Sequence, residues 1–290
     1  MSTALYSAVS GLDAYQEQMD IIGNNIANIN TVGFKTATGN LADSFSNTLQ
    51  AATSGVTGTT ENSTNAMQVG TGVYTGSITN DWSQGGINST GVNTDLYING
   101  NGFFVLGSSN AATTPNYVSQ DGTFTVNSSG YLVQANTGMY VMGANTAGIP
   151  PTGFGAIKID STGYSNPNAS ITSFTINTQG IITVNMSDGG SFQRAQVQLQ
   201  NFTDPQALVN MGSNLYNYDP KDAGGLAAPS AVGSGSLTNT TIDSGAVELS
   251  NVDLSSQMAD LIVAQRAFEA NSKIVTTSDE MLETVVNMKR

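Results

Sequence analysis

An apolar residue recurs every seven positions at each end of the chain, and this spacing restricts both ends to long helices that pack along a partner. The first repeat consists of Leu5, Leu12, Met19 and Ile26, and the second consists of Leu254, Leu261, Phe268, Val275 and Leu282. Such a repeat is typical of a coiled-coil seam, because a period of about 3.5 residues keeps one stripe facing a neighbouring helix. We therefore expect helices over residues 4–28 and 252–288.

The region between the repeats has the composition of strands and turns. Turn signals at residues 99–102 and 127–130 are flanked by β-branched or aromatic residues, which predicts hairpins. Strands are also expected at 171–176 and 181–186, on either side of residues 179–180. Over residues 195–200, apolar residues alternate with glutamines, which predicts one apolar and one amide-bearing face. The expected fold class is α+β and mostly β, with a discontinuous terminal helical coiled-coil domain and an inserted antiparallel β domain.

Shifts in composition divide the chain into five segments and one internal excursion. These are an N-terminal helix of an assembly domain at 1–35, a linker or extended loop at 36–68, a β domain at 69–220 with a short excursion at 143–170, a second linker at 221–244 and a C-terminal helix at 245–290. The linkers are rich in Ala, Ser, Thr and Gly, which is typical of loops. Pairing of the two helices makes the β domain an insertion.

Composition excludes most catalytic, redox and metal chemistry. The chain contains neither Cys nor His. This excludes disulfides, thiol nucleophiles, the Ser-His-Asp arrangement and the usual zinc or copper sites. We expect no enzyme activity, no cofactor and no metal. An alternative is a carboxylate-pair glycosidase that uses two of Asp81, Asp95 and Asp121, but no feature of their spacing supports it.

The charge balance indicates which partners the chain has. A net charge of −13 argues against nucleic acid, because phosphate contacts require a cationic surface. Only 10% of the residues are charged, against about 25% in ordinary soluble domains. An uncharged polar surface suits contacts between copies, because no like charges are brought together.

We expect neither a cleavable signal nor a membrane segment in this chain. The first thirty residues lack a basic start and an unbroken apolar run. No stretch approaches the roughly 20 consecutive apolar residues of a membrane helix. Because the Asn/Gly/Thr-rich, Cys-free composition is typical of an extracellular protein, we expect export by a route that does not read a cleaved signal.

Four stretches in sequence order resemble the bacterial flagellar rod and hook proteins. The first consists of residues 10–12 and 22–35, the second and third lie at 84–104 and 201–208, and the fourth consists of residues 250–254 and 264–273. The resemblance implies that both terminal helices pair in an inner α domain and that subunits stack helically into a hollow tube. It also implies export through the flagellar type III apparatus. The expected location is the hook or basal body of the flagellum.

Two interpretations remain for which member of the family this chain represents. Residues 31–35 and 284–288 resemble the hook protein, whereas the excursion at 143–170 is too short for the outer domain that hook proteins carry. A short hook subunit is the first interpretation, and the distal rod subunit is the alternative. A secreted β-rich adhesin is a distant alternative, which predicts regular strand repeats without helical ends.

If the chain is a subunit of such an assembly, the sequence predicts which residues form the interface and which partners they contact. The expected interface residues are Leu5, Leu12, Met19, Asn24, Asn25, Ile26, Asn28, Gly33, Phe34, Lys35, Leu254, Leu261, Arg266, Phe268, Val275 and Leu282. Expected partners are copies of this chain in a helical filament, other axial proteins and the export apparatus, with no nucleic acid and no membrane insertion. Because Gly11 and Gly23 weaken the first helix, we also predict that the ends are disordered in the monomer and ordered in the polymer.

Overall fold

A computed structural model describes residues 3–52, 65–110, 117–145, 153–166, 169–217 and 229–288, apart from the side chain of Ser236. The chain divides into two compact units. The helical unit consists of Met1–Ala27, Thr36–Asp81 and Val252–Arg290. The β unit consists of Asn28–Lys35 and Trp82–Asn251.

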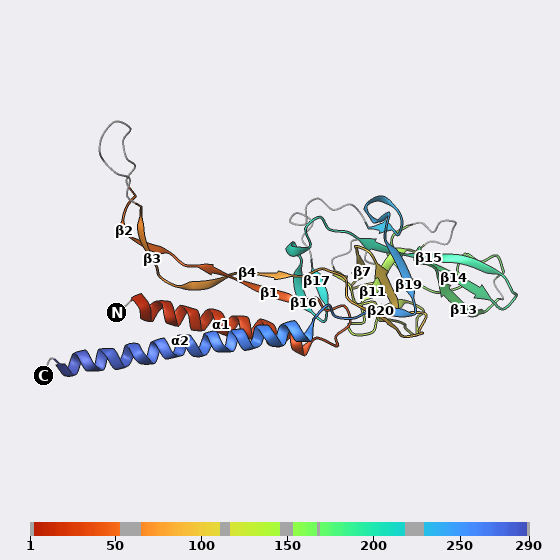
Figure 1. Ribbon diagram of the computed structural model, residues 1–290. Helices are drawn as coiled ribbons and strands as arrows, with labels where there is room; N and C mark the ends of the chain where they lie inside the picture. The colour runs from red at the N-terminus through yellow and green to blue at the C-terminus, as the bar shows by residue number, and fades with distance from the viewer. Residues whose placement is uncertain are drawn as a thin grey trace, which may run out of the picture. The chain divides into compact units, whose positions relative to one another are not determined.

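Two long helices and two strand pairs build the helical unit. Helix α1 (Thr3–Ala27) packs lengthwise against α2 (Leu254–Met288) (Figure 1). Strand β1 (Ala37–Asp43) pairs antiparallel with β4 (Val73–Asn80), and both strands pack on α1. Strand β2 (Ser46–Gln50) pairs antiparallel with β3 (Met67–Gly70). Among the described residues, neither helix contains an apolar stretch that would span a bilayer.

The structure corrects the expected linker at 36–68, because β1, β2 and the start of β3 lie within that range. These strands form from Thr, Asn, Gly and Ala because backbone pairing with β4 and β3 stabilises them, which an apolar pattern does not report. Part of the expected linker, residues 53–64, lies outside the described residues.

The C-terminal helix α2 begins at Leu254, close to the start of the helix expected over residues 252–288. The first residues of the segment assigned to it at 245–290 instead form β20 (Ala246–Glu248). Asp253 caps the helix, because its Oδ1 accepts a hydrogen bond from the backbone N–H of Ser255 at 2.9 Å. The expected second linker at 221–244 contains described strands at its end, and residues 221–228 of it lie outside the described residues.

Antiparallel pairing organises the β unit around one 12-stranded sheet. Its main path runs through β13 (Ile171–Ile176), β14 (Ile181–Met186), β15 (Ser191–Gln200), β11 (Tyr140–Ala144), β7 (Phe103–Gly107), β8 (Tyr117–Ser119), β17 (Leu215–Asn217) and β16 (Val209–Gly212). The strands that branch from this path are β9 (Phe124–Val126), β10 (Leu132–Gln134), β12 (Gly155–Ala156) and β18 (Ser230–Ala231).

Two further strand pairs and two short 3-10 helices complete the β unit. Strand β6 (Leu96–Asn99) pairs with β19 (Thr241–Ser244), and β5 (Ile87–Ser89) pairs with β20. The 3-10 helices are η1 (Pro205–Ala207) and η2 (Gly235–Leu237). With two terminal helices and antiparallel sheets, the expected fold class, α+β and mostly β, is confirmed.

The core of the β unit lies around β7, whose five residues are all buried. The aromatic rings of Phe104 and Phe124 meet edge to face with their centroids 5.0 Å apart. Ile157 and Ile159 are buried in the same core, within the expected excursion at 143–170. That segment is therefore partly structural, because the backbone carbonyl of Ile157 accepts a hydrogen bond from the N–H of Leu132.

One of the two predicted hairpins is present, and the strands expected on either side of residues 179–180 also pair. Residues 127–130 join the paired strands β9 and β10, and residues 179–180 lie between the paired strands β13 and β14. The predicted hairpin at 99–102 is wrong, because β6 pairs with β19, whereas β7 pairs with β8, β11 and β15. Long-range strand pairing overrides the local turn preference there.

The predicted amide face of β15 is largely buried. Gln196 and Gln200 are 6% and 2% exposed, and Gln198 is half-buried. The side-chain amide of Gln196 donates a hydrogen bond to the backbone carbonyl of Gln179 at 3.0 Å. This face therefore stabilises the β unit itself and is not an exposed surface for a second subunit.

Candidate assembly site

The seam between α1 and α2 is built from small residues. The buried positions of α1 include Ala8, Gly11 and Ala14, and those of α2 are Ala264 and Ser278. A Cβ atom on Gly11 would lie 2.5 Å from Nδ2 of Asn271, which is closer than real Cβ contacts. Small side chains therefore let the two helices approach closely.

The apolar repeats predicted from the sequence flank this seam. Leu5, Leu12, Met19 and Ile26 are all half-buried. On α2, Leu261, Phe268 and Val275 are half-buried, whereas Leu254 and Leu282 are 42% and 50% exposed. The heptad spacing predicts both helices, but the heptad residues are not the most deeply buried ones. The closest contacts between α1 and α2 are made by the small residues described above, which lie at other positions.

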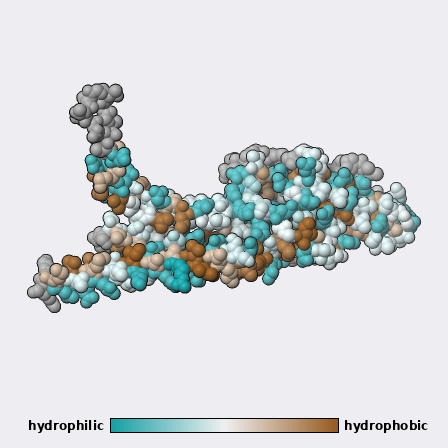
Figure 2. Space-filling model, viewed as in Figure 1, coloured by the Kyte–Doolittle hydropathy of each residue, from teal (hydrophilic) through white to brown (hydrophobic). Residues whose placement is uncertain are grey.

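Large apolar side chains remain exposed on the helical unit. On α2 they include Ile262, Val263 and Val286, and on or beside β2 they include Phe45 at 88% and Leu49 at 63% exposed. Figure 2 shows apolar surface along the helices of this unit. Exposed apolar surface of this kind marks an interaction site.

Asn25 joins three elements of the helical unit. Its side-chain amide donates to the backbone carbonyl of Ala37 at 2.8 Å, and its Oδ1 accepts from the N–H of Ala37 at 3.0 Å. The same amide donates to Oε1 of Gln257 at 3.0 Å. Asn25 is 1% exposed, so it connects α1, β1 and α2 from a buried position. Asn24 is exposed, and Oδ1 of Asn28 accepts a hydrogen bond from the hydroxyl of Thr31 at 3.0 Å.

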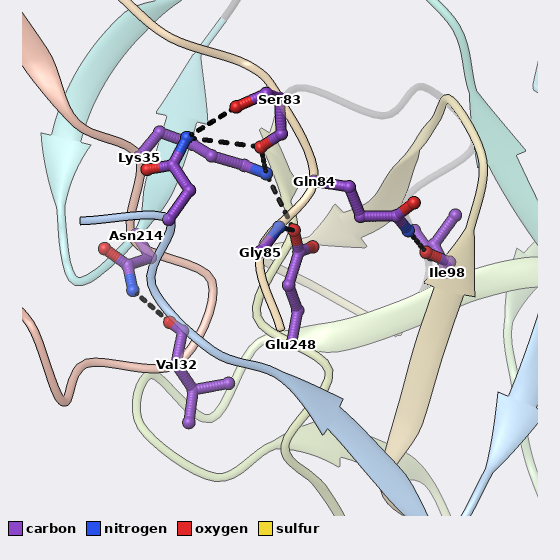
Figure 3. Close-up of polar contacts among 9 residues, drawn as sticks. Val32, Lys35, Ser83, Gln84, Gly85, Ile98, Asn214 and Glu248 are labelled. Atoms are coloured by element: carbon purple, nitrogen blue, oxygen red, sulfur yellow. Dashed lines mark hydrogen bonds and ion pairs between the residues drawn. The ribbon is translucent and has the colours of Figure 1, made fainter. Parts of the chain in front are cut away.

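The segment 28–35 belongs to the β unit, and Gly33 and Lys35 are buried there. Gly33 has a positive φ of 68°, and a Cβ on it would lie 2.8 Å from the backbone nitrogen of Asp121. Both its conformation and its close contact therefore require glycine. Phe34 is half-buried, and the backbone carbonyl of Val32 accepts a hydrogen bond from Asn214 at 2.6 Å (Figure 3).

Lys35 forms a buried ion pair with Glu248 of β20 (Figure 3). Its Nζ lies 2.8 Å from Oε1 of Glu248 and donates to the backbone carbonyl of Ser83 at 2.8 Å. The N–H of Gly85 donates to the same Glu248 oxygen at 2.7 Å. Lys35 and Glu248 are 4% and 5% exposed, so the two charges compensate each other away from water.

Sequence reasoning did not single out Glu248, the partner of Lys35. It is the last residue of β20 and lies between Val247 and Leu249, so the one available signal was a single carboxylate between apolar residues. Arg266, which the sequence placed at the interface, forms an ion pair with Glu269 at 2.8 Å, with side chains 76% and 64% exposed. Such an exposed pair contributes little to stability.

The three carboxylates of the glycosidase alternative lie in different surroundings. Asp121 is fully buried, and its carboxylate accepts hydrogen bonds from Thr123, Gln134 and Asn136. Asp95 accepts a hydrogen bond from Thr90, and Asp81 belongs to the helical unit. Among the described residues, no group of three or more acidic side chains is positioned to hold a metal ion.

Three segments of the chain match models of flagellar families. Residues 5–35 match the family described as "Flagella basal body rod protein", and residues 97–184 match "Flagellar hook protein FlgE/F/G D1 domain". Residues 243–288 match "Flagellar basal body rod FlgEFG protein C-terminal". The matched segments include both helix-bearing ends and much of the β unit.

Full-length similarity distinguishes rod from hook proteins. The chain is 35% identical to the flagellar basal-body rod protein FlgG of Bacillus subtilis over 100% of both chains. It is 32% identical to the FlgG protein of Borreliella burgdorferi, again over 100% of both. The flagellar hook protein FlgE of Treponema pallidum is 41% identical over 143 residues, which are 49% of this chain and 30% of the hook protein.

These findings favour the alternative interpretation over the short hook subunit. The hook-like signals lie in segments whose family models describe rod and hook proteins together, so they do not separate the two. The rod proteins match from end to end, and the hook protein does not. The chain therefore belongs to the family of bacterial flagellar basal-body rod and hook proteins, as a structural subunit of the flagellar axis whose full-length relatives are rod proteins.

Proposed function

We propose that this chain is a subunit of the distal rod of the bacterial flagellum, where it assembles helically with copies of itself and with other axial proteins. The observation that carries the proposal is the exposed apolar surface of the helical unit, on α2 and beside β2. A soluble monomer gains nothing from exposing Ile262, Val263 and Phe45 to water. Contact with a second subunit would remove these side chains from water.

The interface residues follow from this surface. The half-buried repeats on both helices flank the α1–α2 seam, so a neighbouring helix would cover Leu5, Leu12, Met19 and Ile26 on one side and Leu254 and Leu282 on the other. Arg266 lies exposed on the same helix and can exchange Glu269 for a group of a second subunit. Asn25, Gly33 and Lys35 act within one subunit and hold the segments that the assembly requires.

Export without a cleaved signal through the flagellar type III apparatus forms part of the proposal. The composition supports it, because a chain without Cys needs no oxidative folding after export. The chain acts as a structural component and not as an enzyme. We propose no cofactor, no nucleic acid and no membrane insertion for it.

Immunogold labelling of purified hook–basal bodies tests the proposed location. The tag is inserted into the exposed turn at residues 187–189 of the β unit, and the tagged chain replaces the native copy in a motile bacterium. We expect gold particles on the rod of basal bodies. Labelling along the hook would contradict the distal rod and favour the first interpretation made from the sequence. Retained swimming is the control that the tag leaves assembly intact.

A further inference from the structure

A cavity of about 320 Å³ opens within the β unit beside the Lys35–Glu248 pair. We call it the Trp82 cavity. Its apolar wall includes Trp82, Phe103 and Phe202, and its polar wall includes Gln120 and Thr203. The cavity is lined in part by that ion pair, and its other lining residues do not belong to the exposed apolar surfaces discussed above.

Two buried polar atoms in this wall lack hydrogen-bond partners. Among the residues that the structure describes, neither Nε1 of Trp82 nor Oε1 of Gln120 has a hydrogen-bond partner. The indole Nε1 can only donate, and the amide Oε1 can only accept. Buried polar groups are usually paired, so each unpaired group requires an explanation.

The indole is held in a fixed position. Its ring lies edge to face against Phe103, with centroids 5.3 Å apart, and against Tyr216, with centroids 5.1 Å apart. Phe103 in turn meets Phe202 at 5.4 Å. An indole donor held by the Phe103 and Tyr216 rings loses little conformational entropy on binding, which is the property of a preorganised site.

The charges of the wall select a neutral ligand. Lys35 and Glu248 both line the cavity, but they neutralise each other at 2.8 Å. An anion would be repelled by Glu248 and a cation by Lys35, so neither has a free counter-charge. The complement of one donor and one acceptor between aromatic walls is a carboxamide, whose carbonyl accepts and whose NH₂ donates.

We propose that the Trp82 cavity receives an Asn or Gln side chain from a second copy of this chain. The inference rests on the proposed function, because it requires self-assembly. A second copy is the occupant that the chemistry favours, since the chain is rich in Asn and Gln and only 10% of its residues are charged. The carbonyl of the incoming amide accepts from Nε1 of Trp82, and its NH₂ donates to Oε1 of Gln120.

Fluorescence of the wild-type chain tests the proposal directly, because Trp82 is the one tryptophan in the sequence. Acrylamide quenching is measured on the purified monomer and on the assembled polymer. We expect quenching of the monomer and its loss in the polymer, where the second copy covers the indole. Equal quenching in both states would mean that the cavity holds water only, and this result would overturn the proposal.

Two variants test the contact by separate routes. Trp82→Phe removes the donor, and Thr203→Phe fills the exposed rim of the cavity. Losing one neutral hydrogen bond per contact raises the critical concentration for assembly by about fivefold. Ser128→Phe, in the exposed turn between β9 and β10, is the control that places a phenylalanine ring outside the cavity. Thermal melting of each monomer checks that folding is retained.

The outcomes separate this inference from the proposed function. If the wild-type chain fails to polymerise with itself, the proposed function fails, and the inference fails with it. If the wild type assembles, and Thr203→Phe assembles at the same critical concentration as Ser128→Phe, the docking site alone is wrong. A raised critical concentration for Trp82→Phe and Thr203→Phe, with an unchanged control, supports it.

Discussion

The two units of the chain bury their apolar residues to very different degrees. All five residues of β7 are buried in the β unit, whereas the buried residues of the 35-residue helix α2 are Ala264 and Ser278. The β unit therefore contains the core that stabilises it. The helical unit has a thin seam of small residues and large apolar side chains in water. We therefore expect stability to depend mainly on the β unit and assembly mainly on the helical unit, with the Trp82 cavity as a further contact.

Two phenylalanines make this contrast measurable. Phe104 is fully buried in the β unit, and Phe45 is 88% exposed in the helical unit. Phe104→Ala removes a core ring that touches Phe124, and we expect it to lower the free energy of unfolding by about 4 kcal/mol. The fluorescence of Trp82, which belongs to the β unit, follows this unfolding in urea.

Phe45→Ala is the matched substitution on the exposed side. We expect its unfolding free energy to stay within about 0.5 kcal/mol of wild type, because an exposed ring contributes little to a monomer. Assembly, measured by sedimentation, is expected to weaken. If Phe104→Ala kept the wild-type free energy of unfolding, or if Phe45→Ala assembled normally, the expected difference between the two units would be wrong.

The buried ion pair gives the next largest effect. Lys35→Met leaves the carboxylate of Glu248 buried without its counter-charge, and we expect a loss of about 3 kcal/mol in unfolding free energy. The double variant Lys35→Met/Glu248→Met removes both charges and is expected to recover most of this loss. Urea unfolding of both variants is compared with wild type. Equal losses in the single and double variants would show that side-chain packing, not charge, decides the effect.

Two glycines of α1 sharpen the comparison within the helical unit. Gly11 faces Asn271 of α2 across the seam, whereas no atom lies within 4 Å of a Cβ placed on Gly23. Gly11→Leu forces the helices apart, and we expect it to destabilise their pairing by about 2 kcal/mol. Gly23→Leu is the control and should stabilise α1 by about 0.8 kcal/mol, because leucine favours helix over glycine. Helical circular dichroism during heating measures both, and changes of the same sign would contradict the described seam.

The sequence predicts elements whose signal is local. Heptads located both helices, and the turn at 127–130 located one strand pair. The strands of the expected linker escaped prediction because their stability comes from long-range backbone pairing of small polar residues. The hairpin predicted at 99–102 is wrong for the same reason, because β6 pairs with a strand more than a hundred residues away.

The candidate site was predictable as a motif but not as a set of contacts. Asn25, Gly33 and Lys35 stood out in the sequence, yet their partners Ala37, Gln257 and Glu248 did not. Gln257 and Glu248 lie more than two hundred residues from the motif residues that they contact. No local pattern reports such pairs, because each depends on how distant segments fold together.

Acid stability gives the smallest expected effect and tests whether charge matters differently in the two units. In the β unit, burial raises the pKa of Asp160, but the hydrogen bond and charge of Arg194, 2.7 Å away, outweigh it and lower that pKa below 3.8. A lowered carboxylate pKa stabilises the fold above pH 3.8, and this contribution is lost as the pH falls below that value.

We expect the urea midpoint of Asp160→Asn to fall less steeply in acid than that of wild type. Glu269→Gln in the helical unit should leave the curve unchanged, because its pair with Arg266 is exposed. An acid profile of Asp160→Asn parallel to wild type would show that this ion pair does not contribute to the stability of the β unit.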